Sequence, residues 1–167
     1  MSVLAVLFTV LIQSQPAIEA PDLEQRVHTL VNSERLSRKV QALTLDGRLS
    51  KIARTHSEDM ARRGFFNHVN PDGKSPRDRI RIGGYTCAHI VGENIYQSNL
   101  YSRVTISGDR KTYTWKSAEE IAEGSVKGWM QSSGHRQNIL HRSYLKTGVG
   151  VIIAGNGEVF ITQLFCG

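Results

Sequence analysis

Apolar residues recur every three to four positions in two segments of the chain, which is the spacing of one helix face. The first segment begins at Pro21-Asp22, a pair typical of a helix start, and the second follows Asp46-Gly47. The apolar positions are Leu23, Val27, Leu30 and Val31 in the first segment and Leu49, Ile52, Ala53, His56 and Met60 in the second. Both segments are predicted to be amphipathic helices, with His56 as a core residue.

Two further helices are indicated by the residues that would begin them. Ser75 precedes Pro76, which suits a serine cap followed by proline at the first helical position. Ser117 is followed three residues later by Glu120, which is the capping-box pattern. In the helix that follows Ser117, one face is formed by Ile121, Ala122, Ser125 and Trp129. A last short helix is predicted over residues 136–141.

Two segments are predicted to be β-hairpins. Near the C-terminus, two β-rich runs flank the sequence Gly-Asn-Gly at 155–157, a strong turn signal. Residues 101–115 alternate apolar and polar positions around Gly-Asp at 108–109, and this hairpin is either a flap beside a ligand cleft or an ordinary surface loop. Helices followed by a terminal antiparallel pair, with an extended piece near "CAHIVGENIY", predict an α+β sandwich.

The first twenty residues differ from the rest of the chain. The run "SVLAVLFTVLIQ" has an apolar stretch that is too short to span a bilayer comfortably, and it is typical of a secretory signal peptide. An uncleaved anchor and a buried N-terminal segment are the alternatives. No linker or repeat interrupts the remainder, so we expect a signal peptide or anchor over 1–20, a single domain over 21–167, and no stable transmembrane span.

The composition is that of a globular protein, with 40% hydrophobic and 22% charged residues, and it excludes a disordered chain. The net charge of +6 comes from Lys and Arg residues scattered over many segments rather than gathered in one run. Scattered charge indicates a solvated surface, with weak attraction to anionic lipid or cell-wall polyanions as the alternative. No aromatic-basic module for nucleic acid is visible, so we expect no nucleic-acid partner.

Two cysteines, Cys87 and Cys166, are present in the whole chain. In an exported protein two thiols commonly pair, so we predict a disulfide that ties the C-terminus to the middle of the chain. The alternative is a pair of buried free thiols.

Three short stretches carry polar side chains of catalytic or ligating types. They are "GFFNHVNPDGKSP" with His68, "VGENIYQ" with Glu93, and "WMQSSGHRQNIL" with Ser132 and His135. A serine close to a histidine indicates a nucleophile and its base. A histidine at a helix start indicates a ligand for a metal ion or an anion.

These stretches, in this order and together with "TGVGV" and the closing "TQLF", resemble the CAP superfamily of cysteine-rich secretory, antigen 5 and pathogenesis-related proteins. The resemblance is to the short SCP-like domains of prokaryotic type. It implies a three-layer α-β-α sandwich with a central antiparallel sheet and an open cleft lined by four residues. Carried over by position, the cleft residues here are His68, Glu93, Ser132 and His135. Many relatives have Glu where this chain has Ser132, which removes one carboxylate.

The four cleft residues are compatible with three functions. Neutral imidazoles of His68 and His135 would bind Zn²⁺ or another divalent cation, with Glu93 either as a ligand or as the partner that orients one ring. A hydrolase acting on peptide or ester bonds would use His68, His135 and Glu93, either with a metal ion or with Ser132 activated by a histidine. The chain has no G-x-S-x-G motif. A protein-interaction module with a degenerate site is the third possibility.

We expect a secreted or cell-surface binding protein rather than an enzyme. The resemblance implies lipid, sterol or a cell-envelope polymer as candidate partners of the cleft. We expect no organic cofactor, and we expect a monomer.

Overall fold

A central sheet of four strands organises the fold. The computed structural model describes residues 15–167, so most of the predicted export segment 1–20 lies outside the described residues. In spatial order the strands are β1 (Thr44–Leu45), β5 (Lys146–Ile153), β6 (Glu158–Cys166) and β2 (Val91–Asn99). The β5, β6 and β2 pairings are antiparallel, as predicted, whereas the short strand β1 joins the edge of β5 in parallel.

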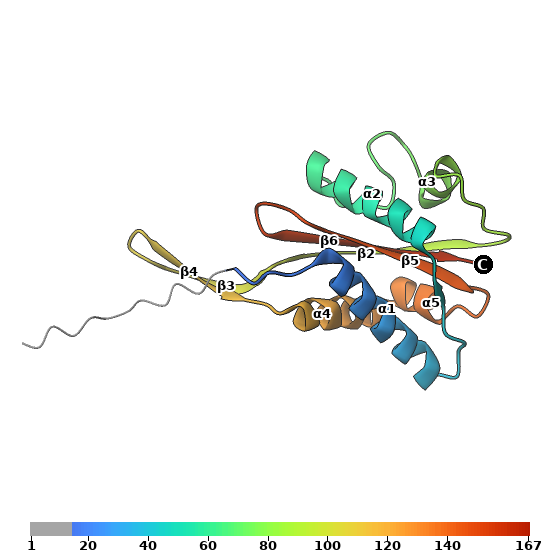
Figure 1. Cartoon of the computed structure of the whole chain (residues 1–167), viewed down its shortest axis with the longest axis horizontal. Helices are drawn as coiled ribbons and strands as arrows, with labels where there is room; N and C mark the ends of the chain where they lie inside the picture. Colours follow the sequence, from blue (N-terminus) through green and yellow to red (C-terminus); the bar gives the residue numbers. More distant parts are fainter. Residues whose placement is uncertain (1–14) are drawn as a thin grey trace, which may run out of the picture.

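Helices cover both faces of this sheet (Figure 1). One face is covered by α2 (Gly47–Arg63) and α3 (Pro76–Ile82), and the other by α1 (Ala20–Ser37), α4 (Ala118–Gln131) and α5 (Ser133–Leu140). The predicted three-layer α-β-α sandwich is therefore confirmed. A two-stranded sheet of β3 (Tyr101–Ser107) and β4 (Arg110–Trp115) extends from one end of the molecule.

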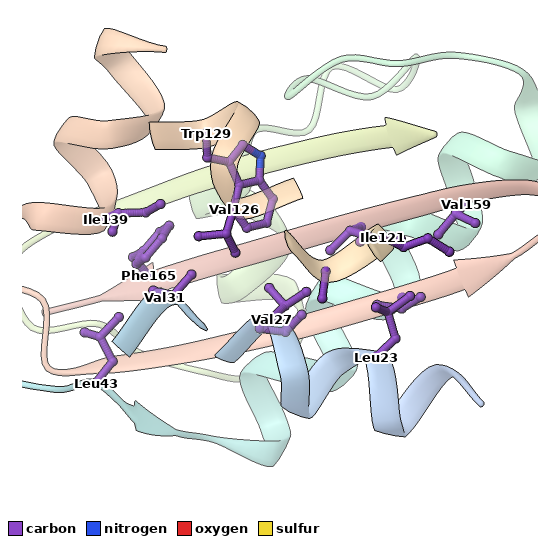
Figure 2. Close-up of a cluster of buried hydrophobic side chains, with 14 of the residues drawn as sticks. Leu23, Val27, Val31, Leu43, Ile121, Val126, Trp129, Ile139, Val159 and Phe165 are labelled. Atoms are coloured by element: carbon purple, nitrogen blue, oxygen red, sulfur yellow. The ribbon is translucent and has the colours of Figure 1, made fainter. Parts of the chain in front are cut away.

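The main hydrophobic core lies between the sheet and the layer of α1, α4 and α5 (Figure 2). The predicted helical stripe is confirmed, since Leu23, Val27 and Val31 are fully buried. Trp129 of α4 fills the middle of this layer, and its indole N–H donates to the backbone oxygen of Ile95 in β2 at 2.9 Å. Burial of each large apolar side chain contributes about 1.5–3 kcal/mol, so this layer holds α4 tightly against the sheet.

On the other face of the sheet, two glycines in β5 allow α2 to pack very closely. A Cβ added at Gly150 would lie 2.0 Å from the backbone nitrogen of Arg54, and one added at Gly148 would lie 2.2 Å from the carbonyl carbon of Leu49. Residues two apart in a strand point to the same face, so both glycines face α2. The "TGVGV" stretch therefore lets the backbone of α2 rest directly on the sheet.

The predicted helix starts are confirmed for α3 and α4, which begin at complete capping boxes on Ser75 and Ser117. The last helix was predicted over 136–141 but runs over Ser133–Leu140. The reason is that Ser132 alone separates α4 from α5, with an extended backbone that ends one helix and begins the next. His135 therefore lies in the first turn of α5 rather than before it.

The hairpin at 101–115 is confirmed by the pairing of β3 with β4, but its expected place beside the cleft is wrong. Glu93 lies near the start of β2, and the hairpin follows the far end of that strand. The six residue-to-residue steps from Glu93 to Asn99 span about 20 Å. Because β2 leads the chain away from the cleft, the flap interpretation does not hold.

The predicted disulfide between Cys87 and Cys166 is confirmed, and it bridges 79 positions of the sequence. It joins the end of β6 to the segment that leads from α3 into β2. Among residues 15–167, no helix is both long enough and apolar enough to cross a membrane.

Candidate functional site

A buried carboxylate lies on the edge strand β2 of the sheet and contacts the layer of α2 and α3. Glu93 is the third residue of β2, and its side chain is only 1% exposed. One carboxylate oxygen lies 2.8 Å from Nδ1 of His68, which belongs to the loop between α2 and α3. The other oxygen accepts a hydrogen bond from Nη2 of Arg79 at 2.5 Å. Both oxygens of Glu93 are therefore occupied, one by an imidazole and one by a guanidinium.

This contact fixes the proton on the His68 ring. A carboxylate only accepts hydrogen bonds, so Nδ1 of His68 must be the donor. In the neutral ring, Nε2 then keeps its lone pair, and the side chain is 44% exposed. The Nε2 atom of His68 thus keeps a free lone pair while Nδ1 is anchored by Glu93.

The second imidazole comes from the other helical layer. His135 lies in the first turn of α5, and its ring centre is 6.2 Å from that of His68. Burial, and then the nearby His68, lower the pKa of His135, so this ring stays neutral at neutral pH. The structure therefore brings His68, Glu93 and His135 together, although they lie far apart in the sequence.

Two asparagines hold α5 against β2. The side-chain amide of Asn138 donates to the backbone oxygen of Glu93 at 3.0 Å and to the side chain of Asn94 at 2.9 Å. Asn94 in turn donates to the backbone oxygen of His135 at 3.1 Å. These contacts set the position of both His135 and Glu93. Sequence reasoning missed both asparagines, although each lies within three positions of a predicted site residue.

Arg79 was also missed. Its Nη1 donates to the backbone oxygens of His68 and Lys74, each at 2.8 Å, while Nη2 holds Glu93. The guanidinium therefore positions the loop that carries His68 as well as the carboxylate. In the sequence, Arg79 lies one turn into the helix that is predicted to begin at Ser75-Pro76. That pattern alone does not tell which face of the helix is buried.

A cavity of about 360 Å³ lies beside this cluster. It is lined by His68, Ser75, Pro76, Arg77, Val91, Gly92, Glu93 and Asn138. Gly92 is required here because an added Cβ would lie 2.3 Å from the hydroxyl of Tyr144. In the "VGEN" stretch, Gly92 thus lets the backbone pass close to Tyr144, and Glu93 supplies the buried carboxylate.

The sequence profile of the cysteine-rich secretory protein (CAP) family matches residues 28–165. The chain belongs to the CAP family. The curated relative YkwD of Bacillus subtilis, named as uncharacterised, is 34% identical over 144 residues, which cover 86% of this chain and 47% of YkwD. The membrane protein YlbC of the same organism, also uncharacterised, is 30% identical over 77% of this chain and 31% of YlbC. This CAP chain therefore spans less than half the length of these relatives.

Solved structures show the same CAP fold. An extracellular protein with an SCP domain from Bacillus anthracis superposes with a TM-score of 0.68 at 26% identity, over 88% of this chain and 41% of that one. An outer surface protein of Borrelia burgdorferi gives a TM-score of 0.70 at 14% identity, over 89% of this chain and 95% of that one. At the lower identity the likeness concerns the fold alone.

Ser132 is the fourth predicted residue of the CAP cleft. It lies three positions before His135 in the turn between α4 and α5, and its hydroxyl makes no cap hydrogen bond to α5. Within the described residues, the Ser132 hydroxyl is hydrogen-bonded to neither imidazole and not to Glu93. A serine activated by a histidine is therefore not assembled in this arrangement.

His56 lies outside the CAP cleft in the core, as predicted. It is 1% exposed, contacts Phe65, and its Nε2 donates to the backbone oxygen of Asn67 at 3.0 Å. Burial lowers the pKa of His56, and the nearby Glu93 carboxylate only partly opposes this effect. The folded protein therefore keeps His56 neutral at a pH where the unfolded chain binds a proton.

The free energy of unfolding should consequently fall on acidification. The contribution of a neutral His56 is complete above the unfolded pKa of about 6.5 and is lost as the pH falls below it, by at most about 1.4 kcal/mol per pH unit. Denaturant titrations between about pH 7 and pH 5 should show a shallower pH dependence for His56→Gln than for the wild type. Parallel curves for the two proteins would contradict a role for His56.

Proposed function

We propose that this CAP protein is an extracellular binding protein whose cleft holds a divalent cation, Zn²⁺ in the first instance, between His68 and His135. The observation that carries the proposal is the hydrogen bond from Nδ1 of His68 to the buried Glu93, which leaves Nε2 as a pre-oriented ligand. A carboxylate that orients a metal-binding histidine in this way is a recurrent arrangement in zinc proteins.

The residues present suit an open site with two protein ligands. A ring-centre separation of 6.2 Å is within reach of two imidazoles that share one ion through Zn–N bonds of about 2.0 Å. Among residues 15–167, no group of three or more His, Cys, Asp or Glu side chains is arranged so that all of them could hold one metal ion. Water or a bound molecule, such as a lipid head group or a cell-envelope polymer, would supply the remaining ligands, and the ion would polarise that molecule's oxygen atoms.

Two observations support an extracellular setting. A disulfide such as Cys87–Cys166 forms and persists in oxidising compartments. The B. anthracis protein with a matching SCP domain is described as extracellular. We further propose that residues 1–20 act as a signal peptide or an N-terminal anchor.

Calorimetric titration with Zn²⁺ at neutral pH tests the site. The wild type is expected to bind, and His68→Ala and His135→Ala are each expected to lose more than about tenfold in affinity, because each removes one of two imidazole ligands. Ser132→Ala should bind like the wild type, since a neutral hydroxyl is a poor zinc ligand. Affinity should fall as the pH is lowered from about 7 to 5, because protons compete for both rings.

Two results would overturn the proposal. One is the absence of wild-type binding below millimolar Zn²⁺, and the other is a His135→Ala variant that binds as tightly as the wild type. Circular dichroism of each variant distinguishes a lost ligand from a lost fold.

A further inference from the structure

The hairpin of β3 and β4 extends beyond the rest of the domain (Figure 1), and apolar side chains gather on one of its faces. Neither strand joins the four-stranded sheet. Tyr101 pairs with Trp115, Val104 with Tyr113, and Ile106 with Lys111, so these residues share one face of the ribbon. We call the apolar members of this set the hairpin face: Tyr101, Val104, Ile106, Tyr113 and Trp115. The opposite face is polar and carries Arg103, Thr105, Ser107, Arg110, Thr112 and Thr114.

The aromatic rings of the hairpin face are already ordered. Tyr113 and Trp115 are stacked with ring centres 5.0 Å apart, and Tyr101 packs edge-on at 5.3 Å from Tyr113. Ile106, near the turn, is 66% exposed. The other four side chains of the hairpin face are half-buried, and Trp115 also packs against the main core. A two-stranded hairpin is only marginally stable in water by itself, so this face would gain stability from an apolar or interfacial partner.

The charges around the turn are mostly positive. Residues 101–115 include Arg103, Arg110 and Lys111 against Asp109, which gives 3 − 1 = +2. Within the described part of the chain, none of these four side chains takes part in an ion pair. Tyrosine and tryptophan rings beside basic side chains are characteristic of protein surfaces that lie at a membrane interface.

The position of the hairpin in the molecule also favours a membrane interface. The segment that leads into α1, dark blue in Figure 1, lies at the same end of the long axis as the hairpin. The apolar run at residues 2–13 precedes that segment in the sequence. A bilayer that holds this run would therefore lie at the end of the domain from which the hairpin extends.

We propose that the hairpin face docks on an anionic phospholipid bilayer, with Ile106 and the aromatic rings in the interfacial layer. Lys111, which lies on the same face, and Arg110, which follows the turn on the opposite face, would then be close to the negative head groups. Each basic residue near such a surface strengthens partitioning by about fivefold, and salt weakens this contribution. The docking surface lies at the far end of β2 from the cleft, so the two proposals do not depend on each other.

Sedimentation with vesicles tests the proposal on the full chain. Vesicles of phosphatidylcholine alone are compared with an equimolar mixture of phosphatidylcholine and phosphatidylglycerol. We expect at least about tenfold stronger binding to the mixture, weakened by salt and by Arg110→Glu/Lys111→Glu. Ile106→Ser should also weaken binding, whereas Ile82→Ser should not. Ile82 is the matched control because it is 65% exposed on α3, toward the other end of the molecule.

Tryptophan fluorescence gives a second readout. Trp115 belongs to the hairpin face, whereas Trp129 is 1% exposed in the core, so lipids brominated on the acyl chain should quench Trp115 alone. Absence of vesicle binding, binding without quenching, or equal effects of Ile106→Ser and Ile82→Ser would each overturn the proposal. So would self-association through the hairpin in place of vesicle binding, as measured by light scattering.

Discussion

Replacing Cys87 and Cys166 together by serine is expected to lower the free energy of unfolding by about 4.5 kcal/mol. The disulfide closes a loop whose ends are 79 positions apart, and a loop of that length loses about this much unfolded-state entropy in the chain-entropy model. Denaturant unfolding of the double variant against the oxidised wild type measures the difference. Without the bridge, the end of β6 also loses its covalent tie to the segment before β2.

A reducing agent provides the control for this experiment. It should destabilise the wild type by a similar amount and leave the Cys87→Ser/Cys166→Ser protein unchanged. A loss below about 1 kcal/mol would mean that the unfolded chain is already compact enough to bring the two cysteines together.

Glu93→Gln is expected to lower the free energy of unfolding by about 3 kcal/mol, because it leaves the guanidinium of Arg79 buried without a counter-charge. Arg79 and Glu93 are both nearly inaccessible, with side chains 9% and 1% exposed. The matched control is Glu34→Gln, since Glu34 pairs with Arg38 at the same 2.5 Å but on the surface. The Glu34→Gln substitution should lower the free energy of unfolding by less than about 1 kcal/mol.

A double-mutant cycle with Arg79→Met separates the ion pair from other effects. If the pair is the cause, Glu93→Gln should be much less damaging when Arg79 is already replaced. An equal loss of stability from Glu93→Gln in the two backgrounds would contradict this interpretation.

The same Glu93→Gln protein should bind Zn²⁺ about 10–100-fold more weakly if Glu93 orients His68, because residues that orient a metal ligand commonly contribute that much to affinity.

The sequence predicted most helices and strands because their signals are local. Capping residues such as Ser117 and the apolar stripe that includes Val27 need no knowledge of the rest of the chain. The resemblance carried by "FNHVNPDG" and "SGHRQNI" predicted that His68 and His135 lie together, which no local pattern predicts. The α-β-α sandwich followed from the same resemblance together with the order of elements.

The features that the sequence did not predict have a common physical origin. Arg79 is an arginine in a short polar helix, and its burial depends on Glu93, which arrives from another strand. The hairpin was misplaced because its pattern predicts a ribbon but not the direction in which β2 extends it. The parallel pairing of β1 involves two residues, too few to leave a periodic signal. Each miss concerns where an element lies rather than what it is.

The position of β6 also bears on how the protein is made. This strand follows β2 and β5 in the sequence, yet it lies between them and pairs with both along its length. The sheet therefore cannot assemble until β6 has been synthesised, because β5 and β2 would have no strand to pair with. Closure of the sheet therefore follows the synthesis of β6 and does not accompany the synthesis of β2 and β5.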